Sequence, residues 1–161
     1  MRIQTLARIF GVVYLVVGIA GFVTMIAPPA PPDAEVISIA TAYSWLLGIF
    51  PVNAAHDIVH IAVGLGGLLF SIGPQRARAY FRVMCVLFAL LTIMGAFRIT
   101  STLFGAAPVY GWDVALHAVT ALFALFAGWG PPSHDEPLLD MSLPPPPPSM
   151  PAPPSAAPGG A

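Results

Sequence analysis

Four long apolar stretches follow one another along the chain, separated by shorter segments rich in proline, glycine or charge. They cover residues 6–27, 53–72, 79–97 and 112–129. A helix needs about 20 apolar residues to cross the hydrocarbon core of a bilayer, so each stretch is long enough for one span. The pattern predicts an all-α fold, a bundle of four transmembrane helices that forms one domain over residues 1–130.

The first connection, residues 28–52, is the longest of the three. It begins with a proline-rich run, which does not allow regular helix, and continues as an apolar segment over residues 34–50. We expect the apolar part to form a short helical segment at the membrane interface, with Tyr43 and Trp45 at head-group level. Asn53 is a typical N-cap residue, and we expect its side chain to cap the second helix.

The last stretch, residues 131–161, consists largely of proline, serine and alanine. Such a composition cannot bury an apolar core and favours extended polyproline II conformations. We therefore predict a disordered, proline-rich tail, and we exclude its histidine, His134, from any site.

Composition and charge support a membrane protein and limit its partners. Of the 161 residues, 57% are hydrophobic and 8% are charged, whereas soluble domains have roughly 25% charged residues. The formal net charge is -1 and no basic run occurs, which gives no support for nucleic acid as a partner. Membrane lipids are the expected partners, and a homo-oligomer is compatible with the sequence.

The arginines predict how the chain is oriented. Most of them lie at the N-terminus or near the connection between the second and third stretches: Arg2, Arg8, Arg76, Arg78 and Arg82. Because Lys and Arg are enriched on the cytoplasmic side of membrane proteins, both termini and the proline-rich tail are expected in the cytoplasm.

Ionisable side chains interrupt the apolar pattern at one level of the bundle. His56 and His60 are four residues apart on the second stretch, and Asp113 and His117 have the same spacing on the fourth, so each pair shares one helix face. With the expected orientation, all of them fall in the outer half of the bundle, where isolated charges would be costly. We call the whole group the polar cluster: His56, Asp57, His60, Arg98, Asp113 and His117.

A structural role is the first interpretation of the polar cluster. In it, Asp57 and Asp113 neutralise Arg98, and the histidines join the second, third and fourth helices through hydrogen bonds. The same residue types would also suit a small proton-coupled carrier, in which histidines and acids relay protons.

A ligand site is the other interpretation. His56, His60, Asp113 and His117 together offer three imidazoles and a carboxylate, which suit zinc, copper or iron. Alternatively, His60 and His117 could be the two axial ligands of a haem between the helices. An enzyme is not expected, because Ser71 and Cys85 lie too far toward the inner side to form a nucleophile–base pair with these histidines.

The sequence also resembles a family of small bacterial membrane proteins with four helices that is catalogued as a domain of unknown function. The resemblance covers about residues 5–130 and rests on Pro-Val-Asn followed by His-x-x-x-His, and on an Asp four residues before a His in the last helix. The matching positions here are Asn53, His56, His60, Gly64, Asp113 and His117. Asp57 departs from the pattern, since the family often has Asn there. The resemblance implies a four-helix fold in the bacterial inner membrane, and no established activity.

Overall fold

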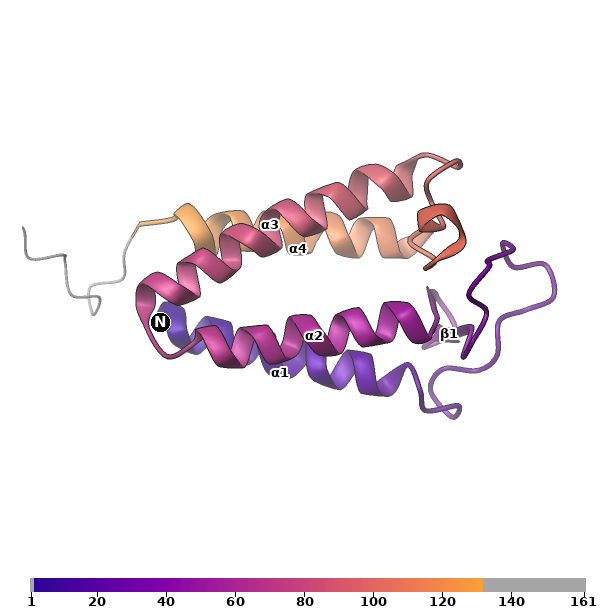
Figure 1. The fold of residues 1–161 in the computed structure, drawn as a ribbon, viewed down its shortest axis with the longest axis horizontal. Helices are drawn as coiled ribbons and strands as arrows, with labels where there is room; N and C mark the ends of the chain where they lie inside the picture. The colour runs from indigo at the N-terminus through magenta and orange to yellow at the C-terminus, as the bar shows by residue number, and fades with distance from the viewer. Residues whose placement is uncertain (1, 132–161) are drawn as a thin grey trace, which may run out of the picture.

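The computed structural model describes residues 2–131, and most of them are helical. The elements, in chain order, are α1 (Ile3–Ala20), β1 (Ser44–Leu46), β2 (Phe50–Val52), α2 (Ala54–Phe70), α3 (Pro74–Ala96), the 3-10 turn η1 (Leu103–Gly105) and α4 (Trp112–Trp129). The N-terminus and the α2–α3 turn lie at one end of the helices, and the hairpin and η1 lie at the other (Figure 1). The predicted tail falls almost entirely on residues 132–161, which lie outside the described residues, as does His134.

Three of the helices, α1, α3 and α4, are long and apolar enough to cross a membrane. The helix α2 is also apolar but has only 17 residues. Large apolar side chains are exposed along the outer faces, among them Val16, Ile93 and Val119, while histidine and aspartate side chains are buried inside. This distribution suits a lipid environment, because hydrocarbon accepts apolar surface but offers ionisable groups no partner.

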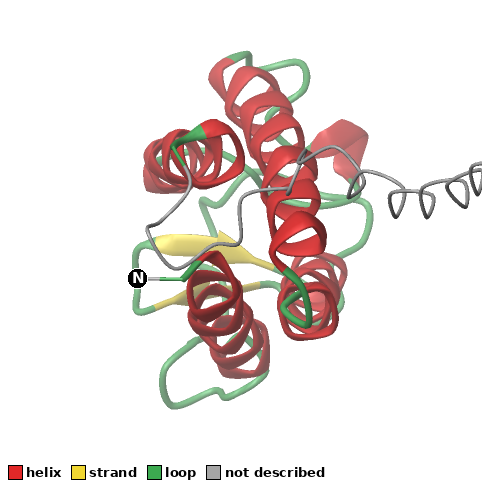
Figure 2. Cartoon of the chain, turned by 90° about the vertical axis from the view of Figure 1, so that its left-hand side faces the viewer, coloured by secondary structure: helices red, strands yellow, loops and turns green. Residues whose placement is uncertain are grey.

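The helices pack as two pairs, α1 with α2 and α3 with α4 (Figures 1 and 2). Glycines allow the first pair to approach backbone to backbone. A Cβ atom added to Gly64 would lie 2.7 Å from the carbonyl oxygen of Gly11, and one added to Gly67 would lie 2.7 Å from the Gly11 Cα atom. Small residues at such positions are typical of helix pairs in membranes, where close packing has to replace the hydrophobic effect.

Aromatic side chains fill the space where the two pairs meet. Phe10 of α1 contacts Tyr80 and Phe81 of α3, with ring centroids 6.0 and 5.5 Å apart, and Phe88 continues the cluster toward the hairpin end. Phe81 and Phe88 are almost fully buried. These edge-to-face contacts are the geometry that aromatic rings prefer, and they hold the pairs together.

The first connection is a correction to the sequence prediction, because residues 21–53 contain a β-hairpin and no helical segment. The hairpin turn has Leu47 and Gly48 at φ values of 54° and 72°, which an α-helix cannot include. The backbone before the hairpin pairs with it, since Trp45 N donates to Pro28 O at 2.9 Å and Ala30 N donates to Tyr43 O at 3.1 Å. Figure 1 shows the hairpin at the end of the bundle where α2 begins.

Helix boundaries also differ from those predicted. The first helix ends at Ala20 and not at residue 27, because the chain turns at Gly21 and residues 26–30 then pair with the hairpin. The third helix begins at Pro74, five residues earlier than residue 79. Proline at the first helical position is favourable, because its missing N–H has no partner within the helix in any case. The fourth helix has the predicted bounds.

Candidate metal centre

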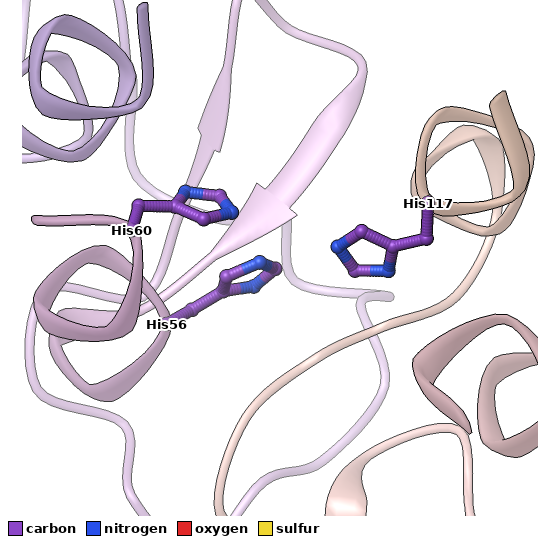
Figure 3. A group of neighbouring side chains, drawn as sticks. All are labelled: His56, His60 and His117. Carbon is purple, nitrogen blue, oxygen red and sulfur yellow. The ribbon is translucent and has the colours of Figure 1, made fainter. Parts of the chain in front are cut away.

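Three histidines that are far apart in the sequence lie together inside the bundle. His56 and His60 come from α2 and His117 comes from α4, and their rings point toward one another (Figure 3). One nitrogen from each ring can be chosen so that all three lie within 4.8 Å of one another. The three side chains are buried, with exposed fractions of 4%, 5% and 1%. We call this group the histidine triad.

Asn53 fixes the start of α2 and so the position of His56. Its Oδ1 accepts a hydrogen bond from His56 N at 2.9 Å, which is N-cap geometry, as expected from the sequence. Its Nδ2 donates to Ile39 O at 2.7 Å and to Ala106 O at 2.8 Å. A single buried amide therefore ties the first turn of α2 to both connections at this end of the bundle.

The first connection (residues 21–53) and the third connection (residues 97–111) also bind each other, and they close the end of the bundle next to the triad. Ser38 N and Ile39 N both donate to Gly105 O, at 2.9 and 3.0 Å. The hydroxyl groups of Tyr43 and Tyr110 are hydrogen-bonded at 2.5 Å. Partial burial, followed by this hydrogen bond, raises the pKa of the Tyr43 hydroxyl.

Asp113 lies beside the triad, one helical turn before His117. Its Oδ2 is 3.5 Å from His117 Nδ1 and 4.0 Å from His56 Nε2, and the residue is only 1% exposed. A carboxylate next to one ring nitrogen commonly orients a histidine so that its other nitrogen is available to a metal. Asp113 is therefore placed to orient His117.

Several polar atoms of this group have no hydrogen-bond partner among the described residues. They are His56 Nδ1, His60 Nδ1, both ring nitrogens of His117, and Asp113 Oδ2. Native proteins pair the large majority of their buried polar atoms, and an unpaired one costs roughly 1–3 kcal/mol. Unpaired nitrogens on three converging rings are what a ligand site requires.

Asp57 and Arg98 do not join this group. The Asp57 carboxylate is fully buried but lies against Gly21 at the end of α1, and neither of its oxygens has a hydrogen-bond partner. Arg98 follows the end of α3 and its side chain is exposed. Within residues 2–131, no ion pair joins Arg98 to either aspartate, so the neutralisation expected in the structural interpretation is not seen there.

Two apolar grooves reach the triad from opposite pairs of helices. The larger, of about 420 Å³, lies between α1 and α4, and we call it the α1–α4 groove; His60 and His117 are part of its wall. The smaller, of about 200 Å³, has His56 and His60 in its wall together with side chains of α3 and the third connection.

Tyr14 and Thr120 are site residues that the sequence reasoning did not select. The Tyr14 hydroxyl donates to Thr120 Oγ1 at 3.1 Å across the α1–α4 groove, and the Tyr14 ring packs edge-on against His60 with centroids 5.4 Å apart. Their signals were present but weak. Thr120 lies one helical turn after His117, and Tyr14 lies on the small-residue face of the first helix between Gly11 and Gly18.

Taken together, the fold and the site define a helical protein of membrane type with a buried histidine triad. The chain belongs to the family described as a domain of unknown function, DUF4383, whose model matches residues 4–130. This agrees with the family resemblance noted from the sequence. Searches of the curated proteins and of the solved structures gave no match.

Proposed function

We propose that this protein is an integral membrane protein that binds one transition-metal ion through His56, His60 and His117. The observation that carries the proposal is the convergence of three buried imidazoles, each of which has at least one nitrogen without a hydrogen-bond partner within residues 2–131. His56 Nδ1, His60 Nδ1 and His117 Nε2 would be the ligand atoms, because Asp113 lies next to the remaining nitrogen of His117 and faces that of His56.

The ligand set favours zinc, copper or iron. Imidazole suits all three metals, and a site with three histidines and no thiolate is typical of centres that keep a further coordination position open. A haem is less well supported. His56 lies close to both other rings, with centroids 4.5 Å from His60 and 5.9 Å from His117, so it occupies space that a flat macrocycle between His60 and His117 would need.

A purely structural network is the second candidate, because the Asp113 carboxylate lies within 4.0 Å of ring nitrogens of both His56 and His117 and so links α4 to α2. It is less favoured than a metal site, since four of the triad's six ring nitrogens have no hydrogen-bond partner within residues 2–131. The proposal of binding without catalysis rests on distance. Ser71, the C-cap residue of α2, lies eleven positions after His60, about 16 Å away, and its hydroxyl donates to Leu68 O.

We further propose that all four helices span the membrane. The 17 residues of α2 measure about 26 Å, slightly less than the roughly 30 Å of a hydrocarbon core, and its polar N-terminal turn is shielded by the two connections. The arginine distribution supports cytoplasmic termini in a bacterial inner membrane, which would put the triad near the outer face.

The test is the metal content of the full chain, purified in detergent, loaded with zinc and dialysed. We expect close to one equivalent of zinc for the wild type and much less for His60→Ala and for His117→Ala. His134→Ala is the matched control, because it removes a histidine outside the described residues and should leave the zinc content unchanged.

Other results would point elsewhere. A Soret band in the purified protein would show that the site binds haem and not a bare metal ion. Wild-type protein that retains no metal under any loading, and that unfolds more easily after His60→Ala, would support the structural network. Loss of pH-dependent transport in vesicles after either substitution, again without metal, would support the proton-coupled carrier.

A further inference from the structure

The α1–α4 groove leads from the lipid-facing surface to the triad. Its walls carry Ile9 and Val13 of α1 and Val119 of α4, which are 50%, 50% and 65% exposed. Its inner end is formed by His60 and His117, which are almost fully buried and have unpartnered nitrogens. A molecule in this groove would therefore meet hydrocarbon along its length and the triad at its tip.

The chemistry at the inner end favours an anion. Three neutral imidazoles compensate none of the charge of a divalent ion, and the Asp113 carboxylate beside His117 would compensate only one of its two positive charges. An anionic ligand at the open coordination position would compensate the other. The Thr120 hydroxyl, which lies in the same wall, could donate a hydrogen bond to a second oxygen of that ligand.

The walls of the groove favour a hydrocarbon chain. Apart from the two histidines, Tyr14 and Thr120, all of its residues are apolar. The volume of about 420 Å³ lies within the range of small-molecule sites, roughly 300–1,000 Å³. A short water-soluble anion such as acetate would leave this apolar surface unfilled.

We propose that the occupant of the α1–α4 groove is a long-chain carboxylate from the bilayer, with its chain in the groove and its carboxylate on the metal ion. The inference rests on the proposed metal site and names the class of its additional ligand. The smaller groove fits such a molecule less well, because it has half the volume and its wall has no hydroxyl group.

The experiment uses the full chain in phosphatidylcholine nanodiscs, loaded with Co²⁺, whose visible absorption reports its ligands. Palmitate is titrated in, with hexadecanol as the ligand that lacks the carboxylate and acetate as the ligand that lacks the chain. Val13→Trp narrows the groove. Val12→Trp is the matched control, because Val12 is equally exposed, at 51% against 50%, and is not in the groove wall.

We expect palmitate to change the Co²⁺ spectrum of the wild type and of Val12→Trp, whereas hexadecanol and acetate do not. The apparent affinity of Val13→Trp for palmitate should be lower than that of the wild type by about tenfold or more. If Val13→Trp does not fold, Val119→Trp and its control Leu122→Trp, with exposed fractions of 65% and 66%, replace the pair.

The two proposals fail in different ways. Absence of any Co²⁺ spectrum would remove the metal site, and the carboxylate ligand with it. A normal Co²⁺ spectrum that palmitate does not alter would overturn only the carboxylate ligand. So would an equal response to hexadecanol or acetate, or an unchanged response of Val13→Trp. Val59 lies in the wall of the smaller groove. If Val59→Trp abolishes the response to palmitate and Val13→Trp does not, the ligand occupies the smaller groove instead.

Discussion

Asp113 provides the sharpest test of how the triad holds its metal. Its Oδ2 lies 3.5 Å from His117 Nδ1 and 4.0 Å from His56 Nε2, both longer than a hydrogen bond, so His117 is the nearer of the two imidazoles that the carboxylate can orient. Asp113→Asn keeps the size of the side chain but removes the negative charge that orients His117 and makes it a better ligand. Changing such an orienting group typically lowers metal affinity 10–100-fold, or about 1.4–2.7 kcal/mol.

The assay is competition for zinc between the protein and a chromogenic chelator of known affinity. Asp57→Asn is the matched control, because Asp57 is as deeply buried as Asp113, at 0% against 1% exposure, while its carboxylate lies against Gly21 and not against the imidazoles. We expect its zinc affinity to equal that of the wild type. Thermal unfolding of both variants without metal shows whether either has lost its fold.

Two results would refute this reasoning. One is a zinc affinity of Asp113→Asn within about threefold of the wild type, or about 0.6 kcal/mol, because Asp113 would then not orient the triad. The other is an equal loss in Asp57→Asn, which would mean that total buried charge, and not the contact with His117, controls binding.

Two further predictions concern the packing that supports the site, and unfolding in detergent measures both. Gly64→Ala should destabilise the protein by about 1–3 kcal/mol, because the new Cβ atom would meet the Gly11 backbone at 2.7 Å. Gly66→Ala in the same helix meets only Tyr80 ring carbons, at 3.2 and 3.7 Å, and should cost clearly less; equal effects would contradict the close approach of α1 and α2. Asn53→Ala should cost about 2–4 kcal/mol through the lost cap and two unpaired carbonyls, and Asn53→Ser, which keeps a capping oxygen, should cost less; identical losses would show that the cap contributes nothing.

The sequence was sufficient to predict the helices and which face of each carries chemistry. The apolar stretches indicated four helices, and the four-residue spacing put His56 beside His60 and Asp113 beside His117. These predictions are local, since they depend only on hydropathy over about 20 residues and on the 3.6-residue period of the helix. The cap at Asn53 is local for the same reason, because its acceptor and donor are three residues apart.

The sequence did not predict the hairpin. Residues 34–50 are apolar, which is compatible with either a helix at the interface or a short strand pair. Pairing between residues 26–30 and the hairpin decided the outcome, and this pairing joins segments that are separated along the chain.

Only the tertiary structure decided which polar residues meet. Periodicity fixes the direction of a side chain relative to its own helix, but not the neighbour that it faces. Asp57 follows His56 directly and so points about 100° away from it, toward Gly21 just after α1, while His56 and His60 face His117 of α4. Arg98 stays outside the group, because α3 ends before it. The sequence by itself therefore determined the ligand types and their helix faces, and the packing of α2 against α1 and across to α4 selected the three histidines that converge.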